Sequence, residues 1–204
     1  PSRAYDPLPT LRPYTWDVEF KPDAFGQAVT LSTRGSDVLA LHALAASLTV
    51  NFERGITGTD LSYTYGALPF DMGMRLFRTV VPRGGRRING GTPEVYPEES
   101  VGVESSIFAR RGRSFDGQSM SLGYSFARLR PTDQVERTAY EPDAQPPRLP
   151  QSALVGTVRA GWSWSSVQSF PYSVGPEKGF GLSANLELTR PELASDYTVA
   201  VASY

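Results

Sequence analysis

Apolar and polar residues alternate with a period of two along several segments of this chain. In residues 119–127 the odd positions are Ser, Gly or Ala, and the even positions are Met120, Leu122, Tyr124 and Phe126. Residues 179–189 repeat the pattern with Phe180, Leu182, Ala184, Leu186 and Leu188. Successive side chains of a strand point to opposite faces, so each segment has one apolar face and one polar or small-residue face. The pattern therefore predicts β-strands.

This alternation predicts nine strands and the beginning of a tenth. We expect them at residues 16–21, 27–34, 41–53, 59–67, 72–81, 100–110, 117–129, 153–166 and 179–189, with the tenth from residue 197. Residues 1–15 contain four prolines and are expected to form an extended linker, because proline has no backbone N–H for a ladder. Ser36 and Asp37 are good helix caps, so a short helix at 38–45 is the alternative to a strand there.

The predicted connections are unequal in length. Those at residues 82–99 and 130–152 are long, and both follow odd-numbered strands, so they emerge at the same end of an up-and-down sheet. Membrane β-barrels have short turns on one side and longer loops outside. A longer connection at 168–178 lies at the opposite end and fits this rule less well. Ten residues at about 3.3 Å each, tilted by about 45°, span roughly 25 Å, the height of the apolar band of such barrels.

The composition of the two faces bears on what surrounds them. The polar face is rich in Ser, Thr, Gly and Ala and poor in Lys and Glu, which favours a crowded lumen over open solvent. Aromatic residues near strand ends are typical of the girdles at lipid headgroups. The aromatic pairs expected there are Tyr63 and Tyr65, Tyr124 and Phe126, and Trp162 and Trp164.

We therefore expect an all-β, antiparallel, up-and-down transmembrane β-barrel, here an incomplete fragment of about nine or ten strands. The alternative is a soluble β-sandwich or a lipocalin-like barrel that binds an apolar ligand, because alternation alone fits a dry core equally well. The residues predicted to face lipid are Leu48, Val50, Met120, Leu122, Tyr124, Phe126, Trp162, Trp164, Leu182 and Leu186.

Composition excludes several classes of protein. The 20 basic and 21 acidic residues nearly cancel, so the basic stripe of a nucleic-acid-binding protein is missing. Without cysteine there is neither a disulfide framework nor a thiolate metal site. No apolar run approaches the roughly 20 residues of a membrane-spanning helix. If this chain spans a bilayer, it must therefore do so as part of a closed barrel, since lipid cannot hydrogen-bond the unpaired backbone groups of an open sheet edge.

Three groups of charged residues carry specific expectations. Arg159 and Glu187 fall on the polar face of neighbouring strands and are predicted to form a lumen-facing pair. Arg75 and Arg78 lie on opposite faces of one strand, so one of them faces lipid unless a bulge or the membrane interface accommodates it. The basic residues in the connection after the fifth strand are candidates for contact with lipopolysaccharide phosphates. They are Arg83, Arg86 and Arg87.

Little in the sequence indicates catalysis. His42 is the only histidine, and a Ser-His-Asp triad would need it beside Asp37 or Asp60. The G-x-S-x-G elbow is missing, so an outer-membrane lipase-like hydrolase is only a third reading. Residues 179–184 match the dinucleotide motif G-x-G-x-x-A, but they open a strand where that motif requires a helix. We predict no enzyme activity, no cofactor and no metal site.

Two segments resemble a known family. Residues 35–42 (GSDVLALH) place an Asp-bearing turn between two early strands, and residues 162–164 (WSW) precede 170–179 (FPYSVGPEKG). In this order they resemble the barrel of the bacterial surface-antigen superfamily, which includes barrel-assembly and two-partner-secretion transporters. Residues 38–40 replace the glycine usual in the first turn of that family. Residues 5–13 resemble the joint that follows a Tol-like β-propeller.

The resemblance implies a bacterial outer-membrane location and a sixteen-stranded barrel, of which residues 16–204 supply the first strands. Residues 1–15 would then be a periplasmic linker. The predicted function is a non-enzymatic membrane anchor or passage of a larger envelope protein. Its expected partners are outer-membrane lipid, the rest of its own barrel and an upstream periplasmic domain.

Overall fold

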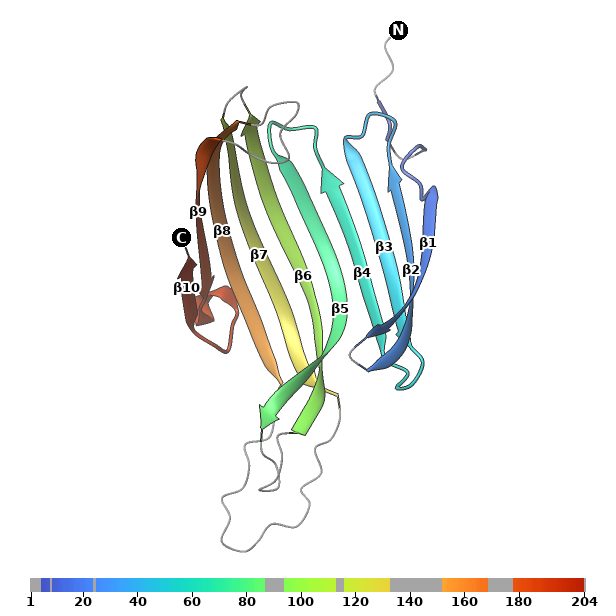
Figure 1. The fold of residues 1–204 in the computed structure, drawn as a ribbon. Helices are drawn as coiled ribbons and strands as arrows, with labels where there is room; N and C mark the ends of the chain where they lie inside the picture. Colours follow the sequence, from blue (N-terminus) through green and yellow to red (C-terminus); the bar gives the residue numbers. More distant parts are fainter. Residues whose placement is uncertain are drawn as a thin grey trace, which may run out of the picture.

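The computed structural model describes residues 5–7, 9–23, 25–86, 94–112, 116–132, 152–168 and 178–203. These residues form one antiparallel ten-stranded sheet in which the strands follow chain order (Figure 1). The strands are β1 (Thr15–Asp23), β2 (Gly26–Ser36), β3 (His42–Asn51), β4 (Thr57–Tyr65), β5 (Asp71–Arg86), β6 (Glu94–Gly112), β7 (Gly117–Pro131), β8 (Ala153–Gln168), β9 (Lys178–Thr189) and β10 (Val199–Ser203). The all-β, up-and-down prediction is confirmed.

The alternative of a helix at residues 38–45 is wrong, because Asp37 organises a turn there. The Asp37 carboxylate accepts the backbone N–H of His42 at 2.8 Å, and the Asp37 N–H donates to the His42 carbonyl at 3.1 Å. Ala40 closes the turn in the left-handed region, with φ of 53°. In the described part of the chain, no helix is long and apolar enough to cross a membrane.

The long connection predicted at residues 82–99 is wrong over most of its length. β5 continues to Arg86 and β6 starts at Glu94, and the two strands remain paired beyond the ends of their neighbours. Pro82 and Pro97 stand opposite each other in this extension. Proline is tolerated here because Pro82 lies past the end of β4, where no strand would receive an N–H, and the chain past β7 uses only the carbonyl of Pro97, which accepts the Thr132 N–H at 3.0 Å. Only residues 87–93 are left between the strands, outside the described residues.

Register divides the sheet into two faces of opposite character. The polar face carries the even residues of β2, β4 and β6 and the odd residues of the other strands, β10 included. The apolar face carries the alternate set. The sequence pattern is thus continued from strand to strand, as the paired registers require.

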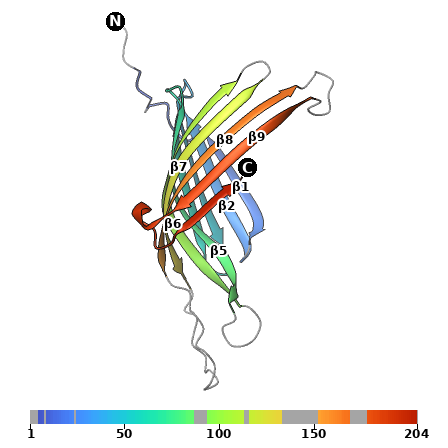
Figure 2. The same ribbon diagram turned by 90° about the vertical axis from the view of Figure 1, so that its left-hand side faces the viewer.

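Few apolar side chains are buried. In the described residues the buried hydrophobic set is Phe25, Ala28 and Ala153, whereas many large apolar residues are exposed. The sheet curves but does not close, since β1 and β10 are its two unpaired edges (Figure 2). In the described residues, the segment before β1 contacts the apolar face at Gly35 and the β9–β10 connection contacts it at Gly156 and Tyr124, and no second layer covers the rest. A single curved sheet is therefore the whole described architecture.

The segment before β1 is not simply extended, as was predicted for residues 1–15. The Pro7 carbonyl accepts the backbone N–H groups of Thr10 and Leu11 at 3.1 and 2.9 Å, which forms a turn. The chain then crosses the end of β2 so closely that a Cβ on Gly35 would lie 2.3 Å from the Arg12 carbonyl oxygen. The segment is therefore packed against the sheet.

The connection between β9 and β10 contains a short 3₁₀ turn, η1 (Pro191–Leu193), that the sequence did not predict. The residues after this turn hydrogen-bond to the part of β8 that extends past the end of β9. The Asp196 N–H donates to the Leu154 carbonyl at 2.8 Å, and the Leu154 N–H donates to the Asp196 carboxylate at 2.6 Å. A Cβ on Gly156 would lie 1.6 Å from the Leu193 carbonyl oxygen, so this contact requires glycine.

Candidate functional site: the two faces of the sheet

All ten residues predicted to face lipid share the apolar face. They come from β3, β7, β8 and β9, and the pairing of these strands and those between them places them on one side. Met120 and Leu182 are more than half exposed, at 58% and 54%. All three tryptophans of the chain, Trp16, Trp162 and Trp164, also lie on this face. The uncovered face is thus both apolar and aromatic.

Aromatic residues gather on this face at the end of the sheet where β3 begins. The His42 Nδ1 atom and the Tyr63 hydroxyl form a hydrogen bond of 2.7 Å, and the His42 and Tyr65 rings are 4.9 Å apart. Trp164 packs edge-to-face on Phe180 at 4.9 Å. The predicted end position of Tyr124 and Phe126 is wrong, because β7 continues to Pro131 and places both residues near its middle.

Charged residues of the apolar face lie at its ends. Among the strand side chains that the structure describes, they are Arg78, Glu99, Arg111, Arg128 and Arg130. The Arg78 Nε atom donates to Glu99 at 2.6 Å, and the Arg130 Nη2 atom donates to the same carboxylate at 2.7 Å. The position of Arg78 is therefore accommodated by pairing at the end of the apolar rows, and no bulge is needed at Arg78.

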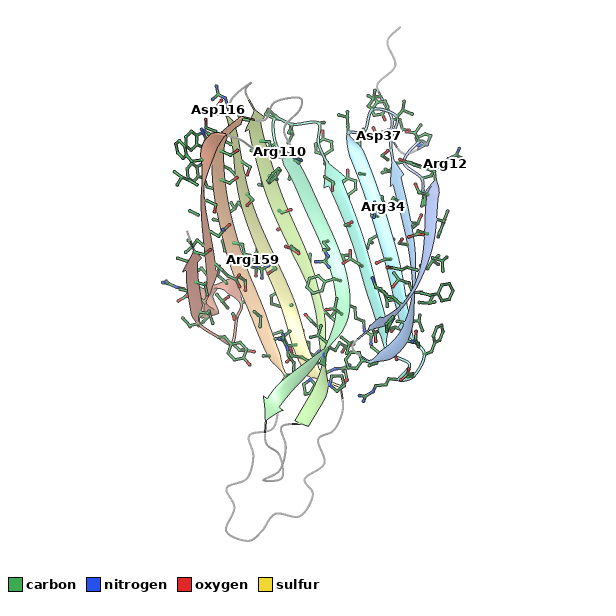
Figure 3. All side chains as sticks on the ribbon, viewed as in Figure 1. Arg12, Arg34, Asp37, Arg110, Asp116 and Arg159 are labelled. Carbon is green, nitrogen blue, oxygen red and sulfur yellow. The ribbon has the colours of Figure 1, made fainter. Side chains whose placement is uncertain are left out.

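The polar face carries a belt of alternating charges. Arg75 on β5 lies between Asp60 on β4, at 2.5 Å, and Glu104 on β6, at 3.5 Å. Arg159 on β8 reaches Glu104 at 4.0 Å across β7 and pairs with Glu187 on β9 at 3.1 Å. The predicted partners Arg159 and Glu187 therefore meet, within a larger belt of five residues. Arg159 lies along the middle part of β8 (Figure 3).

A recess of about 410 Å³ opens on the polar face beside this belt. Its lining includes Arg75, Glu104, Arg159 and Glu187, with small residues of β7 such as Ser125 between them. The small side chains leave room for the Arg159 guanidinium to reach across β7. The polar face is therefore the hollowed side of the sheet.

The basic residues assigned to lipopolysaccharide contact are placed only in part. Arg83 lies on the polar face and donates to Glu98 at 2.9 Å. The backbone of Arg86 stands opposite Glu94, but its side chain lies outside the described part of the structure, as does the whole of Arg87. The described member of this group is thus paired and faces the hollowed side.

The catalytic arrangements that the sequence allowed are not assembled. Asp60 and His42 lie on opposite faces of the sheet. Asp37 accepts the backbone N–H of His42, while the imidazole bonds Tyr63. Residues 179–184 belong to β9, as their alternation predicted. Within the described ranges, no three metal-ligating side chains come together.

Asp37 links the β2–β3 turn to the segment before β1 (Figure 3). The Tyr5 hydroxyl donates to the Asp37 carboxylate, which is 3% exposed. Burial alone would raise the pKa of Asp37, but the hydrogen bonds from Tyr5 and the His42 N–H outweigh it and hold the pKa below its ordinary value. The same hydrogen bond raises the pKa of Tyr5. Sequence reasoning missed this pair, because Tyr5 and Asp37 are 32 residues apart.

Comparisons with family models, with curated proteins and with solved structures found no match for this chain. The candidate function therefore depends on the geometry of the two faces.

Proposed function

We propose that this chain forms part of the wall of a bacterial outer-membrane β-barrel and serves as membrane anchor or passage of a larger envelope protein. In this proposal the apolar face meets lipid and the polar face lines a watery lumen. The observation that carries it is an exposed apolar face whose described charges are confined to its ends, opposite a hollowed face with a belt of ion pairs.

The height of the apolar face supports this reading. On β7, Gln118 and Arg128 flank the apolar residues Met120 to Phe126 on the same face. About ten residues at roughly 3.3 Å each, tilted by about 40°, span about 25 Å, which is the apolar height of outer-membrane barrels. Gln118 and Arg128 therefore stand about one apolar height of a bilayer apart, with the apolar row between them.

The soluble alternative needs the opposite arrangement. A lipocalin-like barrel turns its apolar face inward, around an apolar ligand, and exposes its polar face. Here the recess lies on the face opposite the long apolar rows and holds Phe77, Val155 and Val199 beside its charged residues, so the rows from Met120 to Phe126 do not enclose it, which disfavours that reading. In a bilayer the edges of β1 and β10 cannot stay unpaired, so the proposal includes further strands that complete the barrel. The resemblance to the surface-antigen superfamily agrees with such a barrel and remains part of the proposal.

The first experiment is extraction and gel migration. We expect the protein to partition with membranes, to require detergent for extraction, and to migrate differently in gels before and after heating, because a closed barrel resists detergent until heated. A monodisperse monomer in detergent-free buffer would contradict the proposal.

Two neighbouring substitutions give the matched control. Leu186→Arg places a charge on the lipid-facing side of β9, in the row of Leu122 and at a cost of about 2–4 kcal/mol near mid-depth, whereas Asn185→Arg places it on the polar side. We expect Leu186→Arg to reduce the folded, membrane-inserted fraction and Asn185→Arg to leave it nearly unchanged. Equal effects of the two substitutions would remove the distinction between the faces.

A further inference from the structure

A second group of charges lies on the apolar face, at one end. Arg78 of β5 and Arg128 and Arg130 of β7 surround Glu99 of β6, and we call these three arginines the arginine cluster. Val101 stands opposite both Arg78 and Arg128, and Arg130 stands opposite Glu99. Since adjacent strands are about 4.8 Å apart, the cluster extends about 10 Å across three strands.

Glu99 orients two of the three arginines. Its side chain is 8% exposed and accepts hydrogen bonds from Arg78 at 2.6 Å and from Arg130 at 2.7 Å. Arg78 also donates to the Thr57 carbonyl at 3.0 Å. The side chains of Arg78 and Arg130 nevertheless remain 38% and 54% exposed. Their guanidinium groups are thus held in place and keep further N–H donors accessible.

The cluster has an excess of positive charge. Arg78 and Arg130 share the single carboxylate of Glu99, and Arg128 is exposed and has no ion pair among the described residues. The contrast with Arg83 is clear, because Arg83 faces the polar side and pairs with Glu98. The unneutralised arginines therefore face the same side as the apolar rows.

The position along the strands indicates a depth. The next residues of the same face toward the sheet centre are Leu76, Val103 and Phe126, with Val101 beside the cluster. An arginine facing lipid is costly at mid-depth and nearly free at the interface, where its long side chain can reach the headgroups. The cluster also lies at the end from which the connections after Arg86 and Pro131 leave, and outer-membrane barrels have their longer loops outside.

We propose, on the basis of the proposed function, that the arginine cluster binds the phosphate groups of lipopolysaccharide in the outer leaflet. Guanidinium groups match phosphate oxygens with paired, charge-assisted N–H donors, and two of these groups are already oriented by Glu99. Arg128 and Arg130 stand two residues apart on one face, so both can reach one headgroup.

The test measures binding of lipid A, the phosphorylated glycolipid of lipopolysaccharide, to the folded protein in zwitterionic detergent. We expect Arg128→Gln with Arg130→Gln to weaken binding about a hundredfold, since each of the two lost charge-assisted contacts changes affinity about tenfold. Arg128→Gln alone removes no ion pair of the described structure, so its expected loss, about tenfold, is not explained by misfolding. Removing the phosphates from lipid A should have an effect of the same size as the double substitution.

The matched control is Arg110→Gln with Arg111→Gln, which removes two charges at the other end of β6. Unchanged lipid A binding by this control supports the proposal, and an equal loss overturns it by showing an effect of net charge alone. Unchanged lipid A binding by the variant with both Arg128→Gln and Arg130→Gln overturns the proposal. It is also overturned if the wild type binds dephosphorylated lipid A or phosphatidylglycerol as tightly as intact lipid A. Tryptophan quenching by brominated lipid in the same variants separates the two proposals. If lipid A binding contradicts the headgroup proposal but quenching persists, only the headgroup proposal falls. If the wild type shows no quenching, the proposed function falls.

Discussion

The face of the strand on which a charged residue lies determines which partners its side chain meets in this chain. Arg75 and Arg78 are three residues apart on β5 and therefore face opposite sides. Arg75 lies in the belt of the polar face, and Arg78 lies at the end of the apolar rows beside Glu99. In each place the guanidinium has a carboxylate partner, so neither arginine contributes an unpaired charge near the middle of the apolar face.

The belt predicts a stability effect at Arg75. Arg75→Met removes both ion pairs of Arg75. Asp60 on β4 and Glu104 on β6, the two neighbours of β5, then lose their partner on β5. Because Arg75 is 45% exposed, we expect a loss of only about 1 kcal/mol in the free energy of unfolding, and less at high salt. Urea titration of the folded protein in detergent measures it.

Arg110→Met is the control for this prediction, because Arg110 is on the same face and contacts the ring of Phe108 but has no ion pair in the described residues. A loss at Arg110 as large as that at Arg75, or no salt dependence at Arg75, would contradict the role of the belt.

Sequence alone predicts the members of the two faces but not their full network. Alternation within β8 and β9 was enough to bring Arg159 and Glu187 to one face of neighbouring strands. The other members of the belt depend on the registers of β4, β5 and β6, and on the small side chains of β7 that let Arg159 reach Glu104. No short-range pattern encodes those registers.

At the scale of elements, the β2–β3 turn and the segment before β1 are joined through Asp37. The folded pKa of Asp37 is lowered, so its contribution to stability is present above the ordinary carboxyl value of about 3.9 and is lost as pH falls through the lowered pKa. The pKa of Tyr5 is raised, so its contribution is present below about 10 and is lost as pH rises through the raised value. The joint should therefore persist between these limits.

Tyr5→Phe removes the hydroxyl and should raise the pKa of Asp37 toward or above its ordinary value, because burial then acts with one hydrogen bond fewer against it. Carboxyl NMR titration of Asp37 measures the change. Tyr14→Phe is the control, since the Tyr14 hydroxyl bonds Ser36 at 2.9 Å instead. An Asp37 titration that is identical in the wild type and in Tyr5→Phe would show that Tyr5 does not hold the carboxylate.

All ten strands could be predicted from the period of two, but some connections could not. The extension of β5 and β6 was missed because Pro82 and Pro97 usually end strands, and only their position beyond the neighbouring strands makes them acceptable. The docking of η1 on β8 was missed because it depends on contacts such as Tyr124 hydroxyl to Leu193 carbonyl, at 3.0 Å, across 69 residues. Local patterns carry no information on such contacts.

At the scale of the whole molecule, apolar and polar surfaces are distributed opposite to a soluble domain. Apart from the contacts of the segment before β1 at Gly35 and of η1 at Gly156 and Tyr124, the apolar face is uncovered over the described sheet, and the polar face is hollowed and cross-linked by ion pairs. Under the proposed function, a bilayer provides the missing contact for the first face, and water in a lumen provides it for the second. The central claim is therefore that lipid lies against the apolar face of the sheet.

Tryptophan fluorescence tests that claim directly, because all three tryptophans lie on the apolar face. In bilayers of brominated phospholipid we expect strong quenching of the wild type and weak quenching by aqueous iodide. With the native tryptophans replaced by Phe, Leu122→Trp should be quenched by brominated lipid, and Ser121→Trp, on the opposite face, by iodide. Iodide quenching of the wild type without quenching by brominated lipid would contradict a lipid-facing apolar surface.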